Sequence, residues 1–142
     1  MGKPLSTYDP SQVFITFGGF ALQGIAKGSF VTVDRNEQAF TTYIGSDGEG
    51  ARSKSCNKSA VITIKLMQTS DSNDILNGFA KADELANAGS MPFMVKDGNG
   101  RTLCIAENCW VQKSPTIDFG NEAGEREWKL ESDSVEEFIG GN

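Results

Sequence analysis

The chain has 142 residues, 38% of them hydrophobic and 23% charged, a balance that excludes a disordered chain and suits one domain with a single core. Its net charge of −6 at pH 7 disfavours nucleic-acid binding, because that binding depends on Lys and Arg neutralising phosphates. It contains no histidine, so the commonest general base and the commonest metal ligand are both missing. We therefore expect neither an enzyme nor a cofactor or metal site.

No apolar run approaches the ~18 residues that a transmembrane helix needs, and the N-terminus lacks the apolar stretch of a signal peptide. The sequence thus predicts a chain that does not insert into a membrane and that is made and kept in a cytoplasm. No internal repeat or linker divides it, so we expect residues 1–142 to form a single domain.

The first third of the chain predicts an arm followed by strands. Residues 1–9 have no periodic pattern and predict an irregular N-terminal arm. Residues 12–17 then alternate with the period of two that is typical of a strand, up to a Gly-Gly pair that indicates a bulge or tight bend. Two further strands are predicted at 29–34 and 38–44.

Residues 45–59, GSDGEGARSKSCNKS, change the character of the chain. This stretch is rich in glycine, serine and charge, and loops of such length inside compact domains are usually functional or disordered. We interpret it as a long loop that becomes ordered only against a neighbouring subunit. The alternative is a flexible excursion on the surface.

A central strand and one helix follow the predicted loop. Residues 60–69 alternate with substantial apolar character on both faces, which is typical of a strand inside a sheet and not at its edge. The helix is predicted at about residues 71–88, with Ser70 or Ser72 as N-cap and Gly89 as its left-handed stop.

The last third is β again. Residues 93–96 and 101–112 flank Asp-Gly-Asn-Gly, a strong hairpin signal, and further strands are predicted at 125–131 and 135–139. Cys104 and Cys109 are an odd number of residues apart, so on one strand they are expected to point to opposite faces and to remain free thiols.

Charge is distributed unevenly along the chain. Residues 118–137 contain eight acids and two bases, whereas residues 50–65 contain four bases and no acid. Such polarity in one small domain suggests complementary faces that meet between copies, and scattered solvated charge is the alternative. The acidic candidates for such an interface are Glu125, Glu127, Glu131, Glu136 and Glu137.

The chain resembles the tail tube, or inner tube, proteins of contractile-tailed phages and prophages. Four stretches that together cover nearly the whole chain carry the resemblance: DPSQVFITFGGFALQGIAKGSFVTV, IGSDGEGARSKSCNKSAVITIKLMQTSDSNDIL, VKDGNGRTLCIAENCWVQKSPTIDFGNEAGEREW and the terminal FIGGN. The middle stretch is the most specific, because a GxDGExxRSKS loop is followed there by a strand that ends in LMQTSxSND.

The resemblance implies a mainly β, single-domain barrel or sandwich with one flanking α-helix, a fold shared with the type VI secretion tube protein. It implies hexameric rings that stack into a tube, through which double-stranded DNA passes without specific binding. The partners implied are other copies of the chain, the tail sheath protein, the baseplate or tube initiator, the tail terminator and the tape measure protein. The protein would reside in the virion tail after assembly in the host bacterial cytoplasm.

Contact surfaces take the place of catalytic groups in such a protein. The resemblance implies that residues 45–59 reach a neighbouring ring through Asp47, Glu49, Arg52 and Lys54, and that the arm and residues 134–142 are interface segments. Open strand edges that pair from one subunit to the next would close such a ring. Polar strand residues are candidates for the lumen, namely Thr16, Thr41, Thr63 and Lys65.

Two other interpretations stay open on the sequence alone. A type VI secretion tube or another contractile injection device predicts the same fold with effector cargo in place of DNA. A small soluble ligand-binding β-barrel predicts a monomer with a closed pocket.

Overall fold

The structure is a computed structural model that describes residues 4–141 and consists mainly of strands. One 3-10 turn and one helix accompany them. The elements are η1 Pro10–Gln12, β1 Val13–Phe17, β2 Phe20–Ala21, β3 Val31–Arg35, β4 Phe40–Ile44, β5 Gly50–Lys54, β6 Ala60–Met67, α1 Ser72–Ala86, β7 Met91–Asp97, β8 Leu103–Lys113, β9 Glu125–Ser132 and β10 Val135–Phe138. The expected mainly β fold with one flanking helix is confirmed.

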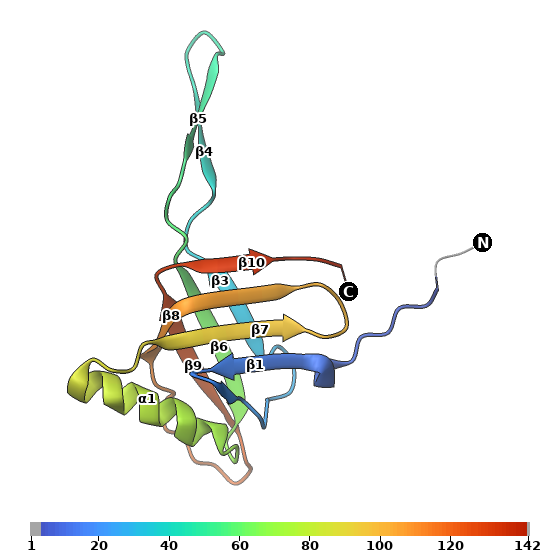
Figure 1. Ribbon diagram of the computed structural model, residues 1–142, viewed down its shortest axis with the longest axis vertical. Helices are drawn as coiled ribbons and strands as arrows, with labels where there is room; N and C mark the ends of the chain where they lie inside the picture. The colour runs from blue at the N-terminus through green and yellow to red at the C-terminus, as the bar shows by residue number, and fades with distance from the viewer. Residues whose placement is uncertain (1–3, 142) are drawn as a thin grey trace.

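Eight strands form one strongly bent sheet in the order β2-β1-β7-β8-β9-β6-β3, and β10 pairs with β8 outside this path. The long strand β8 belongs to two layers, because its first half pairs with β10 and its second half with β9. Figure 1 shows β1, β7, β8 and β10 in front, with β3, β6 and β9 crossing behind them. The result is a sandwich-like body made by folding one sheet over itself.

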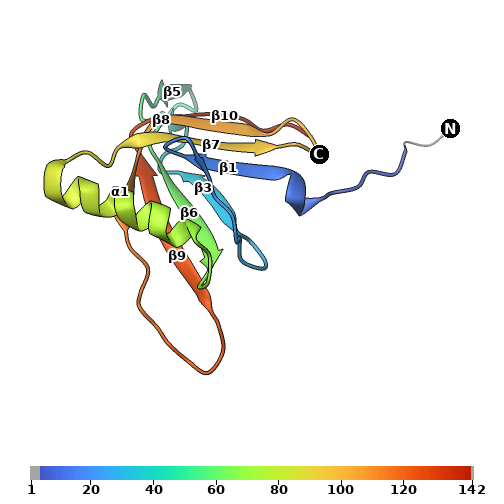
Figure 2. The same cartoon turned by 60° about the horizontal axis from the view of Figure 1, so that its bottom comes forward.

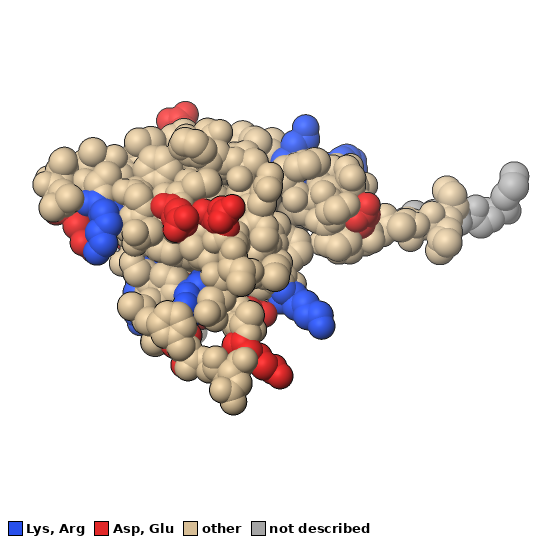
Figure 3. All heavy atoms as spheres, turned by 90° about the horizontal axis from the view of Figure 1, so that it is seen from below, with Lys and Arg blue, Asp and Glu red and all other residues tan. Residues whose placement is uncertain are grey.

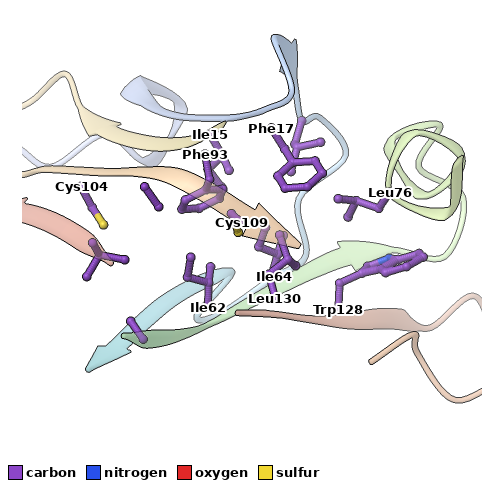
Figure 4. Packing of buried hydrophobic residues seen from close by; sticks show 14 of the residues in the cluster. Ile15, Phe17, Ile62, Ile64, Leu76, Phe93, Cys104, Cys109, Trp128 and Leu130 are labelled. Carbon is purple, nitrogen blue, oxygen red and sulfur yellow. The ribbon is translucent and has the colours of Figure 1, made fainter. Parts of the chain in front are cut away.

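The core lies between these two layers. Alternation places Ile15, Phe17 and Phe93 of the front layer toward Ile64 and Leu130 of the rear layer, and all five are at most 2% exposed (Figure 4). β6 is the central strand of the rear layer, as its two apolar faces predicted, since it pairs with β9 on one side and β3 on the other.

Helix α1 closes one end of the interior. Leu76 is fully buried, and the ring of Phe79 meets Phe17 edge-on at 5.1 Å between ring centroids. Asn73 ties the start of the helix to the sheet, because its Oδ1 accepts a hydrogen bond from Trp128 Nε1 at 2.9 Å. Its amide donates in turn to the carbonyl of Met67 at 3.0 Å.

Both predicted ends of the helix need correction. Asp71 occupies the N-cap position without a side-chain cap, while Ser70 Oγ accepts from the backbone N of Ser72 at 3.2 Å. The helix ends at Asn87, whose φ of 55° is left-handed, and not at Gly89. Gly89 is needed for another reason, because a Cβ there would collide with Phe79 O and Asp83.

The predicted loop at 45–59 is also wrong in part. Residues 50–54 form strand β5, which pairs with β4 in a hairpin whose turn spans residues 45–49. The glycine- and charge-rich composition concealed this strand, because no core face marks it with apolar alternation. Gly48 adopts a φ of 88° in the turn, a conformation that glycine allows without strain.

The expectation that Cys104 and Cys109 face opposite ways is wrong. Both are buried, because a bulge in β8 puts Ala106 opposite Phe93 but Cys109 opposite Met91. The extra residue restores inward alternation across an odd spacing. Both are free thiols, as expected, and burial raises the pKa of Cys104 to about 11 and of Cys109 to about 12.

Candidate assembly interfaces

The hairpin, residues 40–54, rises away from the body at the top of Figure 1. Within residues 4–141 its strands pair only with each other, from Phe40 opposite Lys54 to Ile44 opposite Gly50. Every residue in these two strands is exposed. A two-stranded ribbon is marginally stable in water at best, so the hairpin has the character of a segment that needs a partner.

The four residues predicted as inter-ring contacts all lie on the hairpin. Asp47 and Glu49 are in its turn, where Asp47 Oδ1 accepts from the backbone N of Glu49 at 3.1 Å. Arg52 and Lys54 project from one face of β5, and the Arg52 guanidinium lies 4.2 Å from the centre of the Phe40 ring. The hairpin therefore has an acidic tip and a basic shank.

The root of the hairpin is fixed by a contact that the sequence did not reveal. Ser55 Oγ donates to Glu37 Oε2 at 2.7 Å, and this hydrogen bond is the main cause that lowers the pKa of the Glu37 carboxyl. The backbone N of Ser55 donates to Ala39 O at 2.8 Å. The two side chains are far apart in sequence and share no motif, so no local pattern pointed to them.

Three of the predicted acidic residues lie together on the outward face of β9. They are Glu125, Glu127 and Glu131, and they alternate with the buried side chains of that strand. Glu127 Oε1 lies 3.8 Å from Lys129 Nζ on the same face. The acids are thus interleaved with a base and do not form a single-sign patch.

The other two acids, Glu136 and Glu137, lie on β10 and are engaged within their own chain. Glu136 Oε1 is 3.1 Å from Lys58 Nζ, and Glu137 Oε1 is 3.8 Å from Arg35 Nη1. Lys58 and Glu136 thus pair inside one subunit, and the expected role of these acids in contacts between copies stays a prediction.

The lumen candidates do not share one surface. Thr63 and Lys65 project from the outward face of β6, whereas Thr16 lies on β1 in the other layer and Thr41 lies on the hairpin. Thr63 and Lys65 belong to what we term the polar sheet face, the outward side of β3, β6 and β9. Its polar members are Thr32, Asp34, Thr63, Lys65, Glu125, Glu127, Lys129 and Glu131, and Val61 and Met67 lie among them.

The outward side of the front layer is different, and sequence reasoning missed it. Phe14, Ile105 and Phe138 are 50%, 41% and 58% exposed there, and Met94 lies between Thr16 and Ile105 in the ladder. We term these four apolar residues the apolar sheet face. The alternation in β1 and β8 was visible in the sequence, but both faces of each strand contain apolar residues, so the pattern did not tell which face was covered.

The end of the body opposite the hairpin carries an irregular loop, residues 114–124, which Figure 2 brings forward. Ile117 and Phe119 in this loop are 79% and 74% exposed. Seen from below, acidic and basic side chains are interspersed around the lower lobe of the molecule (Figure 3). The two ends of the long axis therefore differ, since one carries the hairpin and the other this loop.

Chemical sites of other kinds are not apparent in residues 4–141. No group of three or more Cys, Asp or Glu residues in that range is arranged to hold a metal ion. Within the same residues, no helix is long and apolar enough to cross a membrane.

Comparison with known proteins places this arrangement among phage tail components. The family model described as bacteriophage PhiTE tail tube protein matches residues 11–140. The chain is also 32% identical to structural protein ORF10 of Pseudomonas phage KPP10, over 150 aligned residues that cover 100% of this chain and 87% of that protein.

Solved structures share the fold at lower identity. The tube-terminating cap of the anti-feeding prophage is 15% identical, with a TM-score of 0.62 over 97% of this chain and 95% of that one. A chain of the sheath-tube complex of the extracellular contractile injection system PVC is 13% identical, with a TM-score of 0.63 over 93% and 91%. On the family match and the phage homologue, the chain belongs to the phage tail tube protein family, a family of structural proteins.

Proposed function

We propose that this protein forms closed hexameric rings that stack head to tail into the inner tube of a contractile phage tail, a conduit for DNA ejection. The observation that carries the proposal is the hairpin, which extends from the body with every strand residue exposed. A monomer gains nothing from such an extension, whereas a stacked assembly gains a contact that links one copy to the next. Family membership supplies the context.

Open strand edges support the ring. β3 pairs only with β6, and β10 pairs only with β8, so each leaves one edge without a ladder partner among residues 4–141. Uncovered edges of this kind invite pairing with another chain. A heterologous contact that repeats around an axis closes into a ring, and repetition along the axis makes a filament.

The polar sheet face supports the conduit. It carries Asp34, Glu125, Glu127 and Glu131 against Lys65 and Lys129, so acids outnumber bases on it. A surface of this kind offers DNA no row of cations and releases few counterions, so DNA slides past it without specific binding. Within the proposal, Thr63 and Lys65 line the lumen.

The surroundings of the tube follow from the same proposal. The sheath protein covers the outside of the tube, the baseplate or tube initiator and the tail terminator cap its ends, and the tape measure protein fills it during assembly in the host cytoplasm. A related injection device with another cargo is the second candidate, because a tube-terminating cap and a chain of a sheath-tube complex from such devices share the fold. Neighbouring genes separate the two, since capsid genes accompany a phage tail.

Negative-stain electron microscopy of the purified protein at high concentration tests the proposal. Rings or tubes with a central hole are expected from the wild-type chain. A variant in which residues 41–53 are replaced by a short Gly-Ser turn is the matched control, and it should melt like the wild type yet form no tubes. A protein that stays monomeric even with its sheath and baseplate partners present would overturn the proposal.

A further inference from the structure

Strand β9 has an edge that its own chain leaves uncovered. β9 pairs with β6 over its whole length, from Met67 opposite Glu125 to Ala60 opposite Ser132. On its other side it pairs with β8 only from Lys129 onward. Over residues 125–128 that second edge has no ladder partner within residues 4–141, and it borders a groove of about 360 Å³ whose far wall is residues 113–118.

The hairpin offers the complementary element. β5 pairs with β4 on one side, and its other edge has no strand beside it in the described chain. Edge strands with exposed backbone donors and acceptors add to one another, and pockets or charges along the edge then set the register.

The two elements lie at opposite ends of the molecule. The hairpin is at the top of Figure 1, and the loop that precedes β9 is at the bottom. β5 runs from the hairpin tip back toward the body (Figure 1), whereas β9 runs from the loop up into the body (Figure 2). When two copies stack in the same orientation, β5 of the lower copy and β9 of the upper copy are antiparallel.

We propose that β5 of one copy adds to the open edge of β9 in the next copy, with Lys54 opposite Glu125 and Arg52 opposite Glu127. The inference rests on the stacking proposed above and names the surface that receives the hairpin. Arg52 and Lys54 share one face of β5, and Glu125 and Glu127 share one face of β9, so both pairs form on the same side of the joint ladder.

Charge favours this register over its neighbours. The same register brings Gly50, the first residue of β5, opposite Lys129, where β8 begins to pair with β9. A shift by one residue would place Lys54 opposite Arg126, and a shift by two would place Arg52 opposite Lys129. Like charges directly opposite are destabilising, and a one-residue slip also turns the whole strand over.

The far wall of the groove contacts β9 through the side chain of Arg126. Arg126 Nη1 donates to Asp118 O at 3.3 Å, and the Arg126 guanidinium lies 5.5 Å from the centre of the Phe119 ring. Ile117 is 79% exposed. Tyr43 of the hairpin is 74% exposed, and other apolar residues of the hairpin are exposed as well. Docking the hairpin brings these exposed apolar side chains into one interface, which adds hydrophobic burial to the backbone pairing.

Engineered disulfides test the register. In a Cys56→Ser background, Arg52→Cys combined with Glu127→Cys places two thiols directly opposite each other in adjacent copies, within disulfide range. Mild oxidation of assembled tubes should convert most chains into a ladder of covalent oligomers on a non-reducing gel. Arg52→Cys with Glu136→Cys is the matched control and should stay largely monomeric, because Glu136 is on β10.

Charge reversal gives an independent measurement. Arg52→Glu with Lys54→Glu should raise the lowest protein concentration that forms tubes by about tenfold or more, since two attractive pairs become repulsive. Adding Glu125→Lys and Glu127→Lys to the same chain should bring that concentration back to within about threefold of the wild-type value, because each joint takes β5 from one copy and β9 from the next.

The outcomes separate the two proposals. The register is overturned, and the tube proposal stands, if the wild-type chain forms tubes but the Arg52→Cys, Glu127→Cys variant gives no covalent ladder. The same conclusion follows if the control pair gives an equal ladder. The register is likewise overturned if the variant with all four charges exchanged assembles as poorly as the variant with only Arg52 and Lys54 reversed. A wild-type protein that forms no tubes overturns the tube and this inference together.

Discussion

The body and the hairpin both consist of antiparallel ladders, but they are stabilised differently. In the body, Ile64 and Leu130 are fully buried between two layers. In the hairpin, Tyr43 and Ile44 are 74% and 61% exposed, although they occupy an equally regular antiparallel ladder. The comparison teaches that backbone pairing alone does not mark a self-sufficient unit, because most of the stability of a sheet comes from the face that it buries.

The difference also has a consequence for dynamics. Segments with few buried contacts open with free energies near zero, whereas core strands open only with the whole domain. The hairpin therefore belongs to the low-stability end of the molecule, and we expect it to become rigid if the proposed assembly forms.

The largest expected effect is on thiol reactivity, which should differ between the two regions. Cys56 at the hairpin root is exposed, and Cys104 and Cys109 are buried in the body. One thiol per native chain should react rapidly with a disulfide reagent at pH 8. The other two should react at least about a thousandfold more slowly, since their reaction requires opening of the core. All three should react at once in denaturant.

The pH dependence of stability follows from the same cysteines. Burial raises the pKa of Cys109 from 9.0 to about 12, so the folded state resists deprotonation. This contribution is fully present below pH 9 and is lost as the pH rises from 9 toward 12, because the unfolded thiol ionises first. Urea unfolding across that range should show the decline, and Cys109→Ser should make it shallower.

A pair of identical substitutions comes next in size. Ile64→Ala removes a fully buried side chain from the core and should lower the free energy of unfolding by about 2–5 kcal/mol. Ile44→Ala makes the same change on the exposed hairpin and should shift it by no more than about 0.5 kcal/mol. Urea titration of the unassembled protein measures both, and equal losses would show that the hairpin packs on its own body.

The smallest effect concerns the ion pair between Lys58 and Glu136, which joins the chain just beyond the hairpin to β10. Both side chains are largely exposed, at 49% and 75%, so a double-mutant cycle should give a coupling of about 0.5 kcal/mol at low salt. The coupling should vanish near 1 M salt, where screening is complete within a few ångströms. A coupling above about 2 kcal/mol would mean that hairpin root and body act as one unit.

Much of the body could be read from the sequence because its strands bury one face or two. Residues 60–69 predicted a central strand, and β6 is one, flanked by β9 and β3. Residues 125–131 predicted a strand, and β9 spans Glu125–Ser132 with Trp128 and Leu130 buried on its inner face. In each case the hydrophobic period of the strand reports directly on the core.

Elements without a core face could not be read in this way. The sequence predicted a loop where β5 lies, because Arg52, Ser53 and Lys54 bury no side and so show no apolar alternation. The bulge that turns Cys109 inward depends on how β7 lies beside β8, which no local pattern encodes. The pairing of Lys58 with Glu136 likewise arises only when two distant segments become neighbours.

The sequence by itself determined the mainly β class and the helix, and it marked the glycine- and charge-rich segment as a contact segment, a role that stays a prediction. Those features follow from local periodicity and composition, which act within a few residues. Only the tertiary structure decided that this segment is a projecting hairpin, that one sheet face is apolar and the other polar, and that β9 keeps an open edge at the far end. These depend on which distant strands meet, because folding one sheet over itself selects the faces and edges that remain uncovered.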